Sequence, residues 1–218
     1  MAKETNSKRT AEDIITFYMH HVLENEAEPK SIFKFCKEQK IKETDFYKFF
    51  GSFESLQKAI WEKFFDNSIG LIKKNKDYAS MTNEEKMLTF FFTFFENLNL
   101  NRSYVLFVLD GKNHAMEKMA QLKGLRKKMK AFASELIEEG NQEKQIKLLQ
   151  HNEKLFSEGA WLQFLFLLRF WMQDSSPGFE KTDIAIEKSV TTIFQVFENT
   201  PLEKILDFGK FLYKENFA

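Results

Sequence analysis

A chain of 218 residues with 43% hydrophobic and 29% charged residues is typical of a folded protein of one or two domains. The 32 basic and 32 acidic residues cancel, which excludes a bulk electrostatic attraction to nucleic acid, and the single cysteine excludes an internal disulfide and a Cys-based zinc site. The 26 Phe residues stand against only 8 Gly and 3 Pro, so long helices are favoured over the many turns of an all-β fold.

The first third of the chain predicts a helix, two short helices joined by a tight connection at 39–42, and a longer helix. Ile14, Tyr18 and Val22 recur on one face of the first of them. Gly51 ends the third helix and Ser52 caps the fourth. The predicted helical ranges are 10–24, 30–38, 43–49 and 53–74.

The rest of the chain predicts a bundle of longer helices. Thr82 and Glu85 form the pattern of a capping box, and residues 174–178 (Asp-Ser-Ser-Pro-Gly) are the clearest loop. No segment has the pattern of a strand, so the predicted fold class is all-α. The predicted helical ranges here are 83–97, 103–110, 113–139, 143–173, 180–198 and 201–214.

Two short helices joined by a tight turn form a helix-turn-helix. Three segments add a more specific pattern to this motif: Phe35-Cys36-Lys37-Glu38 through Ile41, then Phe46-Tyr47-Lys48-Phe49-Phe50, then Glu54-Ser55-Leu56. Over residues 10–68 this pattern resembles the head of TetR-family transcriptional regulators. The resemblance implies a helix-turn-helix DNA-binding-type domain at 1–68 and a helical ligand-binding and dimerisation domain at 69–218.

The head departs from the family pattern at three positions. Lys40 stands where the turn usually has Gly, Lys42 where a Ser or Thr usually caps the recognition helix, and Phe53 where a Lys usually opens the fourth helix. Residues 1–68 also contain 11 basic and 12 acidic residues, whereas a DNA-binding head is usually basic. These departures preserve the predicted fold and weaken the prediction of DNA binding.

Four residues of the predicted recognition helix are the candidates for DNA contact. Lys42 and Lys48 suit phosphates, Thr44 suits a base edge, and Tyr47 suits a phosphate oxygen. The competing interpretation places Tyr47 in the core and the lysines on a solvated face. Glu43 and Asp45 in the same turn would repel phosphate.

The surplus of Phe in the predicted bundle suits either an ordinary core or a cavity for a small apolar ligand. The candidate ligand-binding residues are Phe91, Tyr104, His114, His151, Trp161, Phe164 and Arg169. His20 and His21 are adjacent and face different directions on a helix, so no metal site is expected. No cofactor motif or catalytic motif is present, and enzyme activity is not expected.

The resemblance implies a cytoplasmic regulator that binds operator DNA as a homodimer through its last two helices and responds to a small apolar ligand. The stretches 88–95 and 161–172 are too short to span a membrane, and the polar N-terminus lacks the pattern of a secretory signal. An alternative of a different class stays open: a TetR-fold protein that binds a lipid or other hydrophobic molecule and has lost DNA binding.

Overall fold

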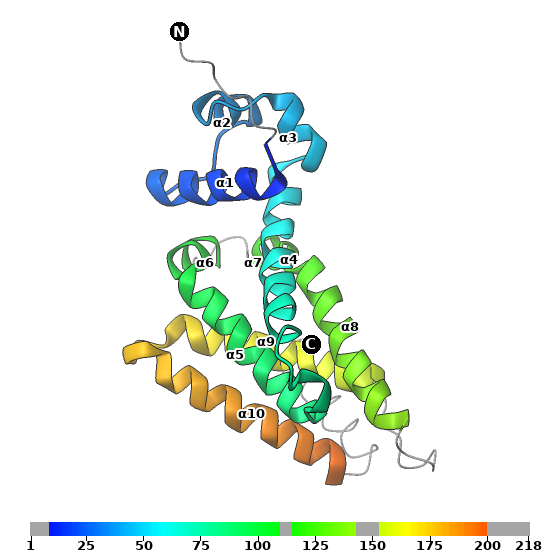
Figure 1. The fold of residues 1–218 in the computed structure, drawn as a ribbon. Helices are drawn as coiled ribbons and strands as arrows, with labels where there is room; N and C mark the ends of the chain where they lie inside the picture. Colours follow the sequence, from blue (N-terminus) through cyan, green and yellow to red (C-terminus); the bar gives the residue numbers. More distant parts are fainter. Residues whose placement is uncertain (1–8, 110–114, 143–152, 200–218) are drawn as a thin grey trace. The chain divides into compact units, whose positions relative to one another are not determined.

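The computed structural model describes residues 9–109, 115–142 and 153–199, and these ranges form helices and no strand (Figure 1). The predicted all-α class is therefore confirmed. The helices are α1 Ala11–Asn25, α2 Ile32–Glu38, α3 Glu43–Phe49, α4 Phe53–Ile72, α5 Asn83–Leu100, α6 Arg102–Leu109, α7 Ala115–Ala120, α8 Lys123–Gln142, α9 Glu153–Gln173 and α10 Glu180–Asn199. The predicted last helix, 201–214, lies outside the described residues.

The chain divides into two compact units. The head unit comprises residues 1–64 and 98–124, and the body unit comprises residues 65–97 and 125–218. The head unit thus contains the helix-turn-helix together with α6 and α7, which lie beyond the predicted boundary at residue 68.

Local hydrogen bonds explain where the helices of the head begin. The side chains of Thr10 and Ser31 accept bonds from backbone N–H groups in the first turns of α1 and α2, whereas Lys42 gives α3 no side-chain cap. Lys40, in the turn between α2 and α3, has a φ of 54°. The left-handed turn of the helix-turn-helix is therefore kept without Gly, at a cost of about 1 kcal/mol.

Phe53 is half-buried and packs against the aromatic core of the helix-turn-helix. Its ring centroid is 5.5 Å from that of Tyr18 and 5.7 Å from those of Phe35 and Phe46. These three rings come from α1, α2 and α3, so Phe53 joins the start of α4 to all three helices. The residue that replaces the usual Lys stabilises the head rather than presenting a charge.

The single helix predicted over 113–139 is wrong, because the chain breaks between α7 and α8. At the break, the buried Gln121 accepts a 2.8 Å hydrogen bond from Nε1 of Trp61. Gly124 follows, and a Cβ there would lie 1.9 Å from Oε1 of Glu62. Contacts with residues about sixty positions earlier in the chain therefore lie at this break, and helical periodicity does not reveal them.

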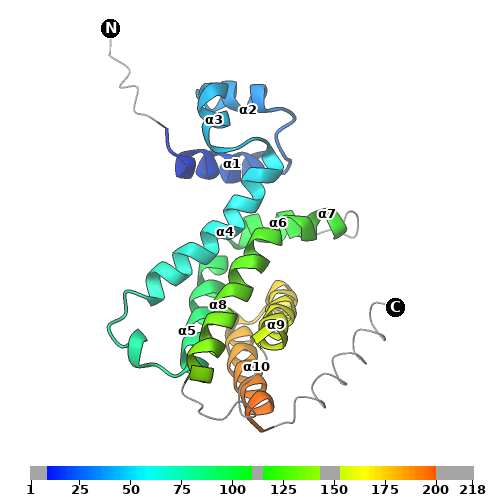
Figure 2. The same cartoon turned by 90° about the vertical axis from the view of Figure 1, so that its right-hand side faces the viewer.

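The body is built on α5, α8, α9 and α10. Thr82 and Glu85 form the predicted capping box, in which each backbone N–H donates to the other side chain. Phe94 of α5 packs edge-on against Phe164 of α9, with ring centroids 5.5 Å apart, and α9 and α10 lie side by side (Figures 1 and 2).

The predicted loop at 174–178 connects α9 to α10. The Asp174 carboxylate accepts hydrogen bonds from the backbone N–H and the hydroxyl of both Ser176 and Thr182, at 2.7 to 2.9 Å. Burial raises the pKa of Asp174, but these bonds outweigh it and lower the pKa to about 2. The carboxylate thus fixes the entry into α10.

Candidate DNA-binding surface and ligand cavity

Thr44, Tyr47 and Lys48 form one exposed face of α3, because residues three and four apart lie together on a helix. Tyr47 is 52% exposed, whereas Phe46 and Phe50 are buried on the inner side of the helix. Lys42, which precedes α3, is exposed as well. All four residues predicted to contact DNA are therefore accessible, and the interpretation of Tyr47 as a core residue is wrong.

The near-neutral charge of residues 1–68 hides an uneven distribution. Residues 30–50, which contain α2 and α3, have six Lys against three acidic residues. The other residues of this range have five basic and nine acidic side chains. All six lysines of the helix-turn-helix are exposed, so this segment presents a local positive surface on a chain whose net charge is zero.

Lys48 is not free on this surface. Its Nζ lies 2.5 Å from Oδ1 of Asp45, one turn earlier in α3. The hydrogen bond from Lys48 is the main cause that lowers the pKa of Asp45, so the carboxylate is ionised at neutral pH. An anion that approaches Lys48 must therefore compete with this carboxylate.

The predicted ligand-binding residues that the structure describes are divided between the two compact units. Phe91, Trp161 and Phe164 are buried in the body, where Trp161 and Phe164 stack with ring centroids 5.2 Å apart. Arg169 is exposed on α9, and Tyr104 belongs to the head unit. His114 and His151 lie outside the described residues.

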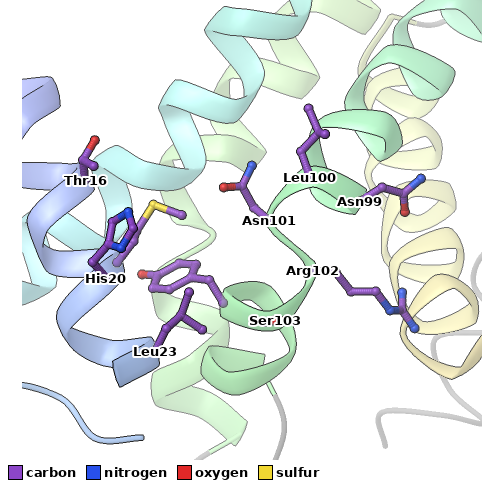
Figure 3. A pocket seen from close by; sticks show the side chains of 10 residues that line it. Thr16, His20, Leu23, Asn99, Leu100, Asn101, Arg102 and Ser103 are labelled. Carbon is purple, nitrogen blue, oxygen red and sulfur yellow. The ribbon is translucent and has the colours of Figure 1, made fainter. Parts of the chain in front are cut away.

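A cavity of about 400 Å³ lies in the head unit between α1 and the junction of α5 with α6 (Figure 3). Thr16, His20 and Leu23 line it from α1, and Asn101 and Ser103 line it from the other side. Of the predicted ligand-binding residues that the structure describes, only Tyr104 lines this cavity.

Burial is the first cause that raises the pKa of Tyr104 well above its ordinary value, with smaller contributions from Tyr18 and Glu28. The Tyr104 side chain is therefore a neutral phenol. Its hydroxyl is buried and has no hydrogen-bond partner within the described parts of the chain.

A second cavity of about 790 Å³ lies in the same unit, beside the start of α4, α6 and α7. Two of the polar side chains in its wall are bonded to each other, since Nε2 of Gln57 donates to Glu28 at 2.9 Å; Nε2 of Gln57 also donates to the Tyr18 hydroxyl at 2.8 Å. Sequence patterns predicted neither cavity, because both are bounded by helices that are far apart in the chain.

Cys36 is packed rather than reactive. It is buried in the head, and burial raises the pKa of its thiol to about 11. Over the ranges that the structure describes, no three His, Cys, Asp or Glu side chains gather as metal ligands. Nor does any helix in those ranges have the length and apolar character needed to cross a membrane.

Comparison with known proteins gives a family match in a part of the chain that follows the helix-turn-helix. The family model described as the tetracyclin repressor-like C-terminal domain matches residues 86–212. No curated protein and no solved structure matches the chain. The family match covers more than half of the 218 residues and accompanies a helix-turn-helix head, and the chain therefore belongs to the TetR family of regulators.

Proposed function

We propose that this TetR-family protein is a cytoplasmic transcriptional regulator that binds operator DNA through α3. The observation that carries the proposal is the exposed face of Thr44, Tyr47 and Lys48 on a locally basic helix-turn-helix. Phosphate contacts supply most of the affinity of such proteins, and contacts to base edges supply the specificity. Lys42 and Lys48 neutralise phosphates, Tyr47 donates to a phosphate oxygen, and Thr44 reads a base edge.

The DNA-binding species is a homodimer. Leu162 and Phe166 lie one turn apart on α9 and are 57% and 55% exposed, and Ile184 of α10 is exposed as well. A second copy of the chain would cover these side chains in a two-fold interface that buries at least about 1,200 Å². Val190 and Phe194 of α10 are buried within the chain and are not available to this interface. Phe197 and the range 201–214 lie outside the described side chains.

A dimer explains how two copies of α3 meet DNA. Successive major grooves are roughly 34–36 Å apart, so the two recognition helices must have this spacing. A ligand that changes the spacing would change the affinity for the operator. Light scattering tests the assembly directly, since a monomer at micromolar concentration would contradict it.

The test of DNA binding is a fluorescence-anisotropy titration with duplexes that tile the promoter region of the protein's own gene, together with a random duplex. Lys48→Glu should weaken binding to every duplex and reduce the slope of log K against log salt by about one or two phosphates, because fewer counterions are released. Lys74→Glu, the same change at an exposed lysine just after α4, should leave both quantities unchanged. Thr44→Gln should reduce affinity for the preferred duplex more than for the random one.

A second function is favoured by one observation: Phe53 occupies the place of a usual phosphate-contacting Lys and packs, half-buried, against rings of α2 and α3 instead. Such a head suits a TetR-fold protein that binds a hydrophobic molecule and no longer binds DNA. If the wild-type protein binds no duplex better than about 10⁻⁴ M at low salt, which is weaker than nonspecific binding, the regulator proposal fails and this alternative stands.

A further inference from the structure

Phe33, near the start of α2, presents its aromatic ring to solvent. Its exposed fraction of 61% is the largest of any Phe in the parts of the chain that the structure describes. Phe35, two residues later, packs edge-on against Phe46 of α3, with ring centroids 6.2 Å apart. Two residues correspond to a rotation of about 200° around a helix, so Phe33 lies on the outer side of α2. This side of the helix-turn-helix therefore carries an apolar contact surface.

Lysines surround the ring of Phe33. Lys30, Lys34 and Lys37 are exposed and lie within four residues of it. A partner that matches this surface combines negative charges with a small apolar group. Duplex DNA has both, because phosphates flank the major groove and thymine presents its C5-methyl group there. A bilayer of anionic lipids fits less well, because it favours a broad apolar face and here one ring stands among charges.

The place of Phe33 in the helix-turn-helix brings it to the edge of the groove. In this motif the second helix lies in the major groove, and the first helix crosses the sugar–phosphate backbone. Phe33 is on the first of the two helices, and its ring cannot form a hydrogen bond with a phosphate or a base edge. The C5-methyl group of thymine is the apolar group that the major groove offers to it.

The helix-turn-helix has few side chains for the usual hydrogen-bonded recognition of bases. Residues 30–50 contain no Arg and no Asn, and Gln39 is half-buried. Arg is the commonest reader of guanine, and Asn and Gln are the usual readers of adenine. Apolar contact with thymine is a means of base selection that the exposed ring of Phe33 can supply.

We propose that Phe33 is a specificity-determining residue, whose ring contacts the C5-methyl group of a thymine in each half-site of the operator. Lys34 and Lys37 bind the adjacent phosphates, which positions the ring without selecting a sequence. This inference rests on the proposed function, because it requires α3 to enter the major groove. It adds to that function the class of operator, which has thymine at the position that α2 meets.

The test uses the preferred duplex from the anisotropy titration, prepared once with thymine and once with uracil at every thymine position. Uracil lacks the C5-methyl group, whereas base pairing and phosphate charge are the same in both duplexes. Loss of one buried methyl contact should weaken binding about threefold, and a dimer makes two such contacts. We therefore expect the full chain to bind the uracil duplex about tenfold more weakly.

Variants of Phe33 assign this preference to one ring. Phe33→Ala should weaken binding to the thymine duplex about tenfold and leave the affinity for the uracil duplex nearly unchanged. Phe33→Lys should bind both duplexes more tightly at low salt, through an added phosphate contact, and should also lose the preference for thymine. Phe92→Ala is the matched control, at an exposed Phe of the body unit, and should keep the preference of the wild type. Thermal unfolding checks that each variant is folded.

The outcomes separate this inference from the proposed function. Equal affinity of the wild type for the two duplexes, or a thymine preference that persists in Phe33→Ala, would overturn the inference and leave the regulator proposal standing. Absence of binding to either duplex would reject both. In that case, cosedimentation with phosphatidylserine vesicles that Phe33→Ala abolishes would assign the ring to an anionic lipid surface instead.

Discussion

The body and head units use the same aromatic-rich composition differently. In the body, Phe90 packs against rings of α4, α5 and α8, and the buried carboxylate of Asp174 is fully hydrogen-bonded. In the head, Tyr47 faces solvent, and the buried Tyr104 hydroxyl has no hydrogen-bond partner in the ranges that the structure describes. Aromatic side chains in the body stabilise the fold, whereas these two tyrosines of the head depart from that pattern, one by its exposure and the other by its unpaired hydroxyl.

The largest effect is expected in the body. Phe90→Ala removes a fully buried ring that contacts Phe65, Phe94 and Phe132. The free energy of unfolding should fall by about 3–5 kcal/mol, measured by urea denaturation. Phe92→Ala on the same helix is the control: Phe92 is 38% exposed, and its loss should cost about 1 kcal/mol or less. Equal losses would show that the α5 rings do not form the core of the body.

The next effect depends on pH. The folded-state pKa of Asp174 is lowered to about 2 from an ordinary value of roughly 3.9, so its stabilisation is fully present above pH 4 and is lost as pH falls toward 2. Asp174→Ala should therefore cost about 2 kcal/mol at pH 6, and the difference from wild type should shrink below pH 4. Urea denaturation of both proteins at pH 6 and pH 2.5 measures it. A difference that is the same at both values would show that ionisation of Asp174 does not contribute.

A smaller effect is expected on the surface of the head. Asp45→Asn removes the carboxylate that holds Lys48 and that would lie near phosphate. DNA affinity at low salt should rise about twofold to fivefold, measured by fluorescence anisotropy. Asp77→Asn, at an exposed position of the body unit, should not change it. Weaker binding by Asp45→Asn would mean that Asp45 orders Lys48 for DNA rather than competing with DNA.

The smallest effect sharpens the contrast between two buried tyrosines of the head. Tyr104→Phe removes a hydroxyl without a partner, so the free energy of unfolding should stay within about 0.5 kcal/mol or rise. Tyr18→Phe removes the acceptor of a 2.8 Å bond from Gln57 and should cost about 1 kcal/mol. Thermal unfolding of both variants measures the difference. A marked loss for Tyr104→Phe would reveal a partner of its hydroxyl within the folded protein.

Sequence alone determined the features that depend on neighbouring residues. Thr10 and Thr82 cap helices because a side-chain oxygen reaches a backbone N–H three residues later. Apolar periodicity likewise predicted the helix-turn-helix. The residue pattern of its second helix, which ends at Phe50, indicated the family, and the family model that matches residues 86–212 confirmed it. These signals extend over a few residues, so they can be read without the fold.

Only the tertiary structure decided the features that join distant parts of the chain. The bond from Trp61 to Gln121 spans 60 residues and accompanies the break between α7 and α8. Tyr47 is exposed because the opposite side of α3 is the one that packs, through Phe46, against Phe35 and Phe53. The unpaired hydroxyl of Tyr104 depends in the same way on how α6 packs against α1. Periodicity shows that a side chain lies on one face of a helix, but the partner of that face depends on packing between helices.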